Sequence, residues 1–464
     1  MKMKVALFAF FLLLCAQPAS ACWFVSPTGN DANAGTSSVA PFASLERART
    51  AMRFGVTVCT NVMQGTYVRS APLVLTSADN GETWIAYASD PVRTAILDGL
   101  CLIPGIFQIS GGSNITIDGL VMRNVEYYGV AIHGGTASVN VSFPFNQTVG
   151  IASGNTVQNS EFYDISAPAF GGNSDFFTSG GVSAEGNVPT TAIRSNYVHD
   201  ANANGLIVWN DAQLNDNISN SVVQNNVVLK TGGSVSDAGG VYVNDYLATS
   251  TNILIDHNYI VDYQGITVAL GHGIYMDQAL SNTTVTNNVI RERTIGADST
   301  SALFNDCGIN NTISNNLIDL GTSGAVSIMG WLKFATGTCT AMTGTTFNKN
   351  IIVMAFTGNQ HTVMFSNGFS YQFGGSIPNF PTISNNMYFN YAGGQARTDG
   401  NGASDGSPVT GSNPLLADNY RLCTASGAPV AGCTVASQAL SAPLNFTQLA
   451  GGWGPPSFSI PAGY

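Results

Sequence analysis

The segment Gln224-Asn225-Asn226-Val227-Val228 is one copy of a short motif that recurs along the middle of the chain. Each copy has polar residues, then an asparagine, then two or more apolar residues. The recurring asparagines are Asn196, Asn226, Asn258, Asn288, Asn316, Asn350 and Asn386, and weaker copies of the motif lie around Ile117–Leu120 and Gln158–Phe162. The spacings between these asparagines are 30, 32, 30, 28, 34 and 36 residues. A period in this range is typical of a solenoid, in which similar coils stack on one another.

The residues between the asparagines indicate the type of solenoid. The apolar runs are short, rich in β-branched and aromatic residues, and alternate with polar residues at a period of two, as strands do. Gly, Asn, Asp and Ser interrupt them every few residues, and no long stripe with a 3.6-residue period suggests helical repeats. We therefore expect coils of short strands that stack as parallel sheets about 4.8 Å apart.

The recurring asparagine itself has a structural explanation. Asparagine tolerates the left-handed backbone of tight turns. If the coils stack in register, its amide can bond the asparagines above and below, as in other asparagine ladders. The motif therefore predicts a ladder rather than a set of ligand-binding residues.

The composition limits the possible functions. A length of 464 residues fits two or three compact domains or one elongated solenoid. Only 9% of the residues are charged, whereas 44% are hydrophobic and can form a large core. The 27 acidic and 16 basic residues give a net charge of −11, which disfavours nucleic acid and anionic membrane surfaces as partners. Neutral ligands, or ligands bound with the help of a cation, remain.

The first residues are typical of a targeting segment. Lys2 and Lys4 precede the apolar run Val5–Cys15, and Ala19-Ser20-Ala21 fits a cleavage site. We expect residues 1–21 to be a secretory signal peptide and the protein to be extracellular or periplasmic. A lipid anchor on Cys22, which cleavage would leave as the first residue, is not favoured. No later stretch has eighteen consecutive apolar residues, so we expect no transmembrane helix.

Seven cysteines remain after the predicted cleavage, and an oxidising compartment favours disulfides between them. Cys423 and Cys433 are ten residues apart and are expected to close a C-terminal loop. Cys307 and Cys339 lie about one repeat apart and are candidates for linking neighbouring coils. One odd cysteine is then left among Cys22, Cys59 and Cys101. The absence of a Cys-x-x-Cys pair disfavours a zinc site.

A second strand recurs in each coil. Its copies align as Gly181–Glu185, Gly205–Trp209, Gly240–Asn244, Gly273–Asp277 and Ser301–Asn305. Their second and fourth residues are apolar almost throughout and are expected to face the core, so the third and fifth residues face outward. One outward row then contains Glu185, Trp209, Asn244, Asp277 and Asn305, and a neighbouring row places Tyr242 beside Tyr275.

Motifs at both ends of the chain resemble secreted, carbohydrate-active right-handed parallel β-helix proteins of the pectate-lyase-like superfamily. The motifs that carry this resemblance are Trp23–Asp31, Gly35-Thr36, Pro41-Phe42, Leu45 with Ala48, Gly65–Tyr67, Ile96–Gly99, Asn413–Leu416, Tyr420–Leu422 and Ser426–Pro429. The resemblance covers most of the chain after the signal peptide and is more specific for the fold than for the activity. Within this group the chain looks most similar to β-helix glycoside hydrolases.

The repeat and the resemblance together predict an all-β protein. We expect one single-stranded right-handed parallel β-helix of about nine to eleven coils with N- and C-terminal caps. An N-terminal cap and first coils would span 22–110, the central β-helix 111–400, and a C-terminal coil and cap 401–464.

The resemblance also implies a catalytic pair. The segments Asp237–Tyr242 and Gly273–Asp277 are similar to a pair of segments in such hydrolases, where the two aspartates act on the glycosidic bond. One carboxyl protonates the leaving oxygen and the other acts as a base or nucleophile, at about 5 Å for retention or roughly 6.5–9.5 Å for inversion.

This pair requires a particular chain path. Asp277 aligns with Asn244, seven residues after Asp237, and an extended chain would separate those ends by about 23 Å. The glycine-rich stretch Gly232–Gly240 would therefore have to fold back over the face.

A second arrangement avoids that requirement, because Asp245, Asp277 and Asp306 fall at nearly the same height on three successive coils. Neighbouring carboxylates can raise one another's pKa enough to make one of them an acid. The alternative is that these aspartates are polar turn residues that cap strand ends.

Aromatic and other polar residues complete the candidate site. Trp209, Tyr242 and Tyr275 are candidates for stacking on sugar rings, unless they only pack against one another between coils. Asn244 and Asn305 are candidates for binding the substrate beside them. Glu185 lies three coils from Asp277, roughly 14 Å by strand spacing, and is a weaker acid candidate.

Two histidines are weaker candidates still. His272 is a candidate for orienting a sugar or moving a proton, although a solvated turn histidine is the favoured interpretation. His199 and Asp200 are expected to form a turn.

We therefore expect a secreted, monomeric enzyme that hydrolyses glycosidic bonds in a polysaccharide or complex glycan, without a cofactor or bound metal. One alternative is a polysaccharide lyase, which needs a basic residue and often Ca²⁺; Lys230, Arg291 and Arg293 are the nearest candidate bases. The other is a glycan-binding solenoid without catalysis. No motif indicates a nucleotide cofactor or a serine-hydrolase triad.

Overall fold

The protein is described by a computed structural model. The structure describes residues 22–55, 57–137, 146–166, 179–202, 204–210, 216–232, 238–245, 249–263, 271–277, 280–291, 301–306, 308–321, 325–327, 342–355, 381–394, 404–416, 420–428, 433–449 and 453–461. The expected signal peptide therefore lies outside the described residues, as do Asp237, Arg293, Cys307 and Cys339. In the described part of the chain, no helix is long and apolar enough to cross a membrane.

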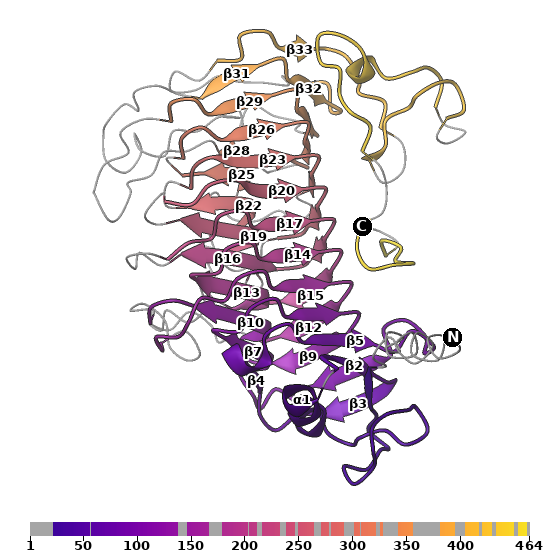
Figure 1. Cartoon of the computed structure of the whole chain (residues 1–464). Helices are drawn as coiled ribbons and strands as arrows, with labels where there is room; N and C mark the ends of the chain where they lie inside the picture. Colours follow the sequence, from indigo (N-terminus) through magenta and orange to yellow (C-terminus); the bar gives the residue numbers. More distant parts are fainter. Residues whose placement is uncertain are drawn as a thin grey trace, which may run out of the picture.

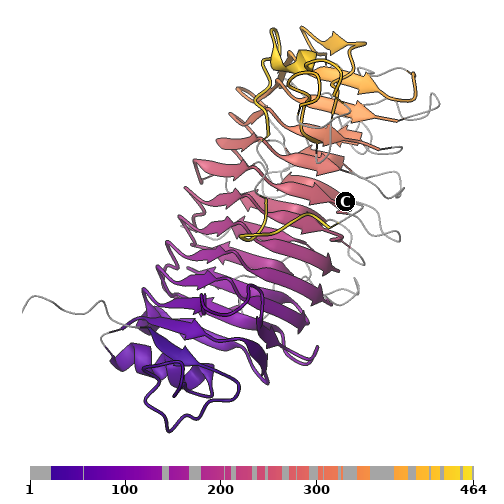
Figure 2. The same cartoon turned by 90° about the vertical axis from the view of Figure 1, so that its right-hand side faces the viewer.

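Three long parallel sheets run side by side along the stack of coils (Figures 1 and 2). Sheet A contains β1 (Trp23–Val25), β2 (Cys59–Val62), β5 (Thr83–Ala86), β8 (Thr116–Asp118), β11 (Thr156–Gln158), β14 (Ala192–Arg194), β17 (Val222–Gln224), β20 (Ile253–Asp256), β23 (Thr283–Thr286), β26 (Thr312–Ser314), β29 (Thr346–Asn348) and β31 (Thr382–Ser384). Sheet B contains β3 (Gly65–Val68), β6 (Ala95–Asp98), β9 (Val121–Val125), β12 (Glu161–Ile165), β15 (Tyr197–Ala201), β18 (Val227–Leu229), β21 (Tyr259–Val261), β24 (Val289–Arg291), β27 (Leu317–Asp319), β30 (Ile351–Met354), β32 (Met387–Asn390) and β33 (Val409–Thr410). Sheet C contains β4 (Leu73–Thr76), β7 (Gly105–Ser110), β10 (Tyr128–Gly134), β13 (Gly180–Gly186), β16 (Leu206–Asn210), β19 (Ala238–Asp245), β22 (Gly271–Asp277), β25 (Ser301–Asn305) and β28 (Ala325–Ser327).

Successive strands of each sheet come from successive coils, so the predicted parallel β-helix is confirmed. The inward residues of the three sheets form one apolar core along the whole stack. In sheet C, Val241 and Val243 belong to this core, whereas Tyr242 belongs to a separate cluster on the outer face. The alternation expected from the sequence is therefore present.

The predicted asparagine ladder lies at the corner between sheets A and B. It runs through Asn196, Asn226, Asn258, Asn288, Asn316, Asn350 and Asn386. Asn258 shows the repeating geometry: its Nδ2 donates to Asn288 Oδ1 at 2.9 Å and to the carbonyl of Val223 at 2.9 Å. Its Oδ1 accepts from the backbone N–H and the side chain of Asn226. At the last coil the Asp405 carboxylate takes the place of the next asparagine.

The left-handed residue of each turn precedes the ladder asparagine, which corrects our expectation that the two coincide. The left-handed positions, with φ between 52° and 58°, are Ser195, Asn225, His257, Asn287, Asn315, Lys349 and Asn385. The ladder asparagine is selected by its buried amide, whereas the residue before it need only tolerate the turn.

Glycines in the first half of β19 and β22 let sheets B and C approach each other. A Cβ at Gly240 would lie 2.5 Å from Ile260 Cγ2, and one at Gly273 would lie 2.4 Å from Ile290 Cγ2. Each glycine therefore faces a core isoleucine of sheet B that leaves no room for a side chain.

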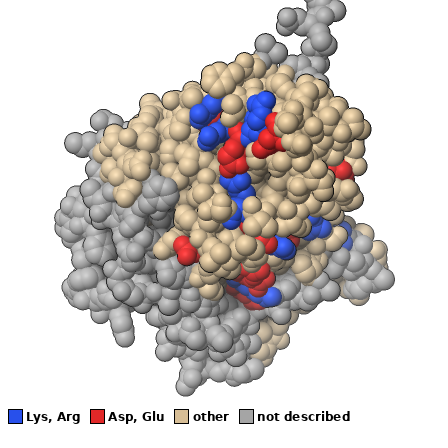
Figure 3. All heavy atoms as spheres, turned by 90° about the horizontal axis from the view of Figure 1, so that it is seen from below, with Lys and Arg blue, Asp and Glu red and all other residues tan. Residues whose placement is uncertain are grey.

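Helix α1 (Leu45–Phe54) closes the N-terminal end of the core with Leu45, Ala48 and Met52. In its last turn, Arg53 pairs with Asp79 of the short 3-10 helix η1 (Ser77–Asp79). Figure 3, a view from this end, shows blue and red side chains next to one another in a narrow band on a largely uncharged surface.

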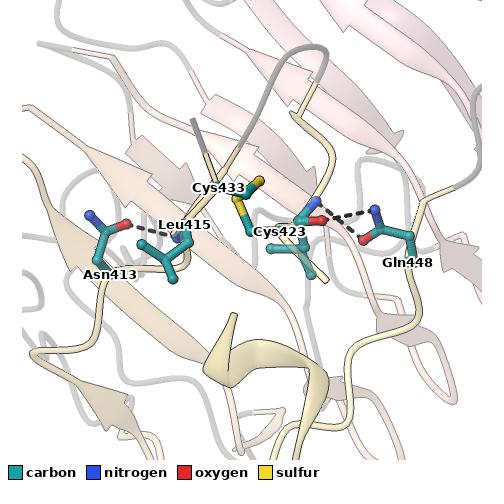
Figure 4. The surroundings of a disulfide bond; sticks show 6 residues. Asn413, Leu415, Cys423, Cys433 and Gln448 are labelled. Atoms are coloured by element: carbon teal, nitrogen blue, oxygen red, sulfur yellow. Dashed lines mark hydrogen bonds between the residues drawn. A yellow bond between two sulfur atoms is a disulfide. The ribbon is translucent and has the colours of Figure 1, made fainter. Parts of the chain in front are cut away.

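Two disulfides are present in the described residues. Cys423 is bonded to Cys433, as predicted, in the C-terminal loop shown in Figure 4, where Gln448 also bonds the adjacent backbone. Cys22 is bonded to Cys59, so the odd cysteine expected among the first three is Cys101, which is exposed.

The chain after β33 folds back over the outer face of sheet B. It includes the 3-10 helix η4 (Gln438–Leu440), and Figure 2 shows part of it, in yellow, lying beside the middle coils. Trp453 packs on Tyr259 and Phe458 on Tyr197, with ring centroids 5.1 and 4.6 Å apart. A backbone hydrogen bond also joins the C-terminal segment to the solenoid: the Gly454 N–H donates to the carbonyl of Asn225 at 2.7 Å. This segment shields apolar residues that point outward from sheet B.

Replacing Asn258 by alanine should destabilise the protein by about 2–4 kcal/mol, because it leaves buried donors and acceptors of Asn226, Asn288 and Val223 without partners. The shift of the urea midpoint measures this. Thr284→Ala, a truncation on the partly exposed outer face of the adjacent strand, should cost less than about 1 kcal/mol. Equal effects would show that the ladder is not important for stability.

Glu82→Gln should stabilise the protein at neutral and alkaline pH. Burial, and next the charge of Asp79, raise the pKa of Glu82 to about 8 in the folded state. The folded state therefore binds more protons than the unfolded state between about pH 4.5 and pH 8, and wild-type stability falls as pH rises through this range. The glutamine variant lacks this loss and should be more stable by ~2–4 kcal/mol above pH 8, with the difference vanishing below pH 4.5.

Unfolding midpoints from pH 4 to 9 test this prediction. Glu46→Gln is the matched control, with an expected effect of opposite sign. Burial alone would raise the pKa of Glu46, but the hydrogen bond from Arg69 outweighs it and lowers this pKa. Glu46→Gln should therefore be less stable than the wild type at pH values above the usual pKa of a glutamate. A pH-independent difference for Glu82→Gln would contradict the prediction.

Candidate functional site

The outer face of sheet C carries two rows of side chains that cross the coils. The first row contains Ser110, His133, Glu185, Trp209, Asn244 and Asp277. The second contains Gln108, Ala131, Ser183, Ile207, Tyr242, Tyr275 and Phe304. The outward alignment of Glu185, Trp209, Asn244 and Asp277 predicted from the sequence is confirmed.

The aromatic residues of these rows form a continuous stack. The ring centroids are 6.4 Å apart between Trp209 and Tyr242, 5.0 Å between Tyr242 and Tyr275, and 4.9 Å between Tyr275 and Phe304. All four side chains are only 2–6% exposed. Their packing against one another between coils, one of the two interpretations of the sequence, is therefore present; whether they also contact a substrate stays a prediction.

Asp277 is the last residue of β22, and two residues of the neighbouring strand β19 donate hydrogen bonds to it. Tyr242 Oη donates to Asp277 Oδ2 at 2.7 Å, and Asn244 Nδ2 donates to the same oxygen at 3.2 Å. Asn244 Nδ2 also donates to Tyr242 Oη at 3.1 Å. The three side chains form a compact hydrogen-bonded group that is 2–6% exposed.

The register of β25 differs by one residue from our sequence alignment. The structure pairs Met276 with Asn305, so Asp306, whose N–H donates to the Met276 carbonyl at 2.8 Å, lies opposite Asp277. Asn305 is therefore not part of the outward row. It is fully buried and accepts a hydrogen bond from Asn311. Our alignment was wrong by one residue, and a slip of one residue moves every side chain of a strand to the other face of the sheet.

Asp245 is also separated from this row. Asn244, not Asp245, pairs with Asp277, and Asp245 lies on the inward side of β19 with no exposed surface. Its carboxylate accepts from Asn210 Nδ2 at 3.0 Å and from the Ser250 N–H at 2.7 Å. Asp245 is therefore within one residue of the expected height, but it faces inward and bonds the Ser250 N–H, in agreement with the alternative of a residue that caps the strand end.

Glu185 lies three strands from Asp277 in the first row, as expected, and is 1% exposed. His133 is its neighbour on the preceding coil. Burial lowers the pKa of His133, so this imidazole is neutral at physiological pH. Asp237, the other aspartate implied by the resemblance, is outside the described residues.

His272 is not a solvated turn residue, which corrects the favoured interpretation of the sequence. It lies within β22 and is 1% exposed, and its ring packs against Tyr275 and Phe304 at 4.5 and 4.6 Å. Burial lowers its pKa to about 3. His272 is therefore a buried side chain in contact with the aromatic stack, and it is neutral near pH 7.

His199 and Asp200 form no turn either, because both belong to β15 on the outer face of sheet B. His199 Nδ1 lies 2.7 Å from Asp200 and its Nε2 lies 3.2 Å from Glu161. Burial opposes its charged form, but these two carboxylates outweigh that effect and raise the pKa of His199.

Of the candidate bases of a lyase, Lys230 and Arg291 lie on sheet B rather than on the sheet that carries Asp277. Lys230 follows β18 in sheet B and lies 3.5 Å from Asp200. Arg291 ends β24 in the same sheet and lies 3.6 Å from Asp319. The strands of sheet C, within their described bounds, contain neither lysine nor arginine. Among the described residues, no group of three or more His, Cys, Asp or Glu side chains is arranged to hold a metal ion.

Comparison with known proteins identifies the fold of this chain but does not assign it to a family. No family model matches the chain, and no curated protein sequence matches it. The GH136 lacto-N-biosidase from Eubacterium ramulus is similar in structure, with a TM-score of 0.50, 12% identity, and coverage of 84% of this chain and 67% of that chain. Its selenomethionine derivative gives a TM-score of 0.51, again at 12% identity, with coverage of 84% and 68%.

A second similar structure is XylC, solved in complex with xylose. It has a TM-score of 0.50 and 11% identity, and the match covers 93% of this chain and 94% of that chain. The present chain therefore has the parallel β-helix fold found among carbohydrate-active proteins, as the resemblance in the sequence implied.

The two histidines should titrate very differently in NMR spectra. The His272 imidazole signals should not shift between pH 8 and pH 4, because its pKa is about 3. Those of His199 should titrate above the usual midpoint of about 6.5. Loss of each signal in His272→Gln and His199→Gln assigns them. A His272 midpoint near 6 would show that its ring is open to water.

Proposed function

We propose that this protein is a secreted enzyme that hydrolyses glycosidic bonds in a polysaccharide or complex glycan, with Asp277 as one of two essential carboxyl groups. The observation that carries the proposal is the placement of Asp277 on the outer face of sheet C, bonded by Tyr242 and Asn244, with Asp306 opposite it on the next coil. Glycoside hydrolysis needs two carboxyl groups on either side of the scissile bond.

The coil spacing supports Asp306 as the partner of Asp277. Neighbouring strands are about 4.8 Å apart, which is closer to the ~5 Å carboxyl separation of retaining enzymes than to the 6.5–9.5 Å of inverting ones. In the proposed reaction Asp277 attacks the anomeric carbon while Asp306 gives its proton to the leaving oxygen. Water, deprotonated by Asp306, then cleaves the glycosyl ester and restores both groups.

The surroundings of Asp277 favour hydrolysis over β-elimination. A lyase needs a basic side chain at the uronate, and the candidates Lys230 and Arg291 are paired with acids on sheet B. The outer face of sheet C instead presents Glu185, Asp277 and Asp306, which suits an uncharged sugar better than a uronate.

Asp277→Asn and Asp306→Asn should each reduce the release of reducing ends by at least about 100-fold, because each removes a carboxyl that takes part in bond cleavage. The assay uses a panel of neutral and uronate-containing glycans, with NMR to record whether the anomeric configuration of the first product is retained. Asp164→Asn is the matched control: Asp164 is exposed on sheet B, and asparagine tolerates its left-handed backbone.

Three outcomes would contradict the proposal. Equal hydrolysis by wild type and Asp277→Asn would remove Asp277 from the mechanism. Unsaturated products that absorb in the ultraviolet would indicate a lyase. Binding of a glycan without new reducing ends would indicate a non-catalytic solenoid.

A further inference from the structure

Tyr242 and Asn244 bond Asp277 in a directional chain. The Asn244 amide donates to both Tyr242 Oη and Asp277 Oδ2, at 3.1 and 3.2 Å. Because the Tyr242 oxygen accepts from Asn244, its single proton is available to Asp277 Oδ2, 2.7 Å away. One carboxylate oxygen thus receives two donors.

This arrangement suits only one protonation state of the carboxyl group. An ionised carboxylate accepts hydrogen bonds at both oxygens, whereas a protonated carboxyl has a donor of its own. Two donors aimed at one oxygen stabilise the ionised form relative to the protonated form. The effect is large here because all three side chains are at most 6% exposed, and hydrogen bonds strengthen where water is excluded.

We propose that Tyr242 and Asn244 are positioning residues that keep Asp277 ionised, so that Asp277 is the nucleophile and the proton must come from another carboxyl group. This inference rests on the proposed function for its catalytic meaning, but the hydrogen-bonded group is a property of the fold. It gives both residues a role different from the sugar contacts expected from the sequence.

The other groups around Asp277 are consistent with this assignment. Phe304 of β25 lies opposite Tyr275, and Asp306, the residue after β25, lies opposite Asp277. A second negative charge at Asp306 would repel that of Asp277, so ionisation of Asp277 favours the protonated form of Asp306. On β22 itself, His272 is uncharged because burial lowers its pKa. Glu185 is three strands away.

The test is the pH dependence of kcat/KM for Tyr242→Phe, which removes the hydroxyl but keeps the ring in the aromatic stack. The activity of the wild type should fall at low pH as Asp277 becomes protonated. In the variant this fall should move up by about one pH unit, which is about a tenfold loss at pH values below the wild-type limb. Asn244→Asp should move it further, because a carboxylate then faces Asp277.

Tyr128→Phe is the matched control. Tyr128 belongs to the same outer cluster and is equally buried, but it lies on β10, four strands from β22. This variant should leave the acid limb in place. A uniform loss of activity in Tyr242→Phe without a shift along the pH axis would overturn the proposal, because it would indicate a purely structural role.

A second measurement needs no activity. The difference in unfolding midpoint between wild type and Asp277→Asn, followed from pH 3 to 8, reports the ionisation of Asp277. With Tyr242→Phe in both proteins, this difference curve should move up by about one pH unit. A shifted curve without glycan hydrolysis would support the positioning role and refute the proposed function, whereas an unshifted curve would refute the positioning role itself.

Discussion

From β14, the sixth strand of sheet A, onward, the buried amide of a ladder asparagine fixes the register of each coil relative to the next. The amide nitrogen donates to the next ladder asparagine and to a carbonyl of the preceding coil, and the amide oxygen accepts from the side chain and backbone N–H of the preceding asparagine. A shift of one coil would therefore break several buried hydrogen bonds at once. The register of sheet C follows, because its strands are joined to the same coils. The alignment of Asn244 with Asp277, and so the hydrogen-bonded group at the candidate site, depends on this ladder.

The constraint acts across large distances in the sequence. Tyr242 and Asp277 are 35 residues apart in the sequence, although they lie on neighbouring strands. Stacking of the coils brings the two residues together, because neighbouring strands are only about 4.8 Å apart. The same device places polar residues of different coils in one row while the core remains apolar.

Much of this architecture was predictable, because it depends on local patterns. The period of the asparagines predicted the coils, and the alternation in Gly240–Asn244 predicted which side chains face outward. The position of Asp306 was missed because Ser301–Asn305 was aligned by its first residue with Gly273, although serine has no steric reason to occupy the glycine position. Ala302 pairs with that glycine instead, as the register of its neighbours requires.

Other features depend on contacts that no local pattern encodes. The burial of His272 results from the rings of Tyr275 and Phe304, the latter on another coil. Pairs such as Val227-Val228 after the ladder asparagine did carry a signal, because the outward member of each pair is also apolar and must be covered. The sequence does not indicate what covers it; in the structure, the returning C-terminal segment does so.

That returning segment has a consequence for how the chain is made. Coils can stack one after another as they leave the ribosome, but the hydrophobic stripe on sheet B stays open to water until the segment from Leu422 to Ile460 has been synthesised. A nascent chain, or one cut short before Leu422, would carry a row of Val, Leu, Ile and Tyr side chains on a finished solenoid. Such a surface favours self-association, so the segment from Leu422 to Ile460 that covers it also keeps molecules apart.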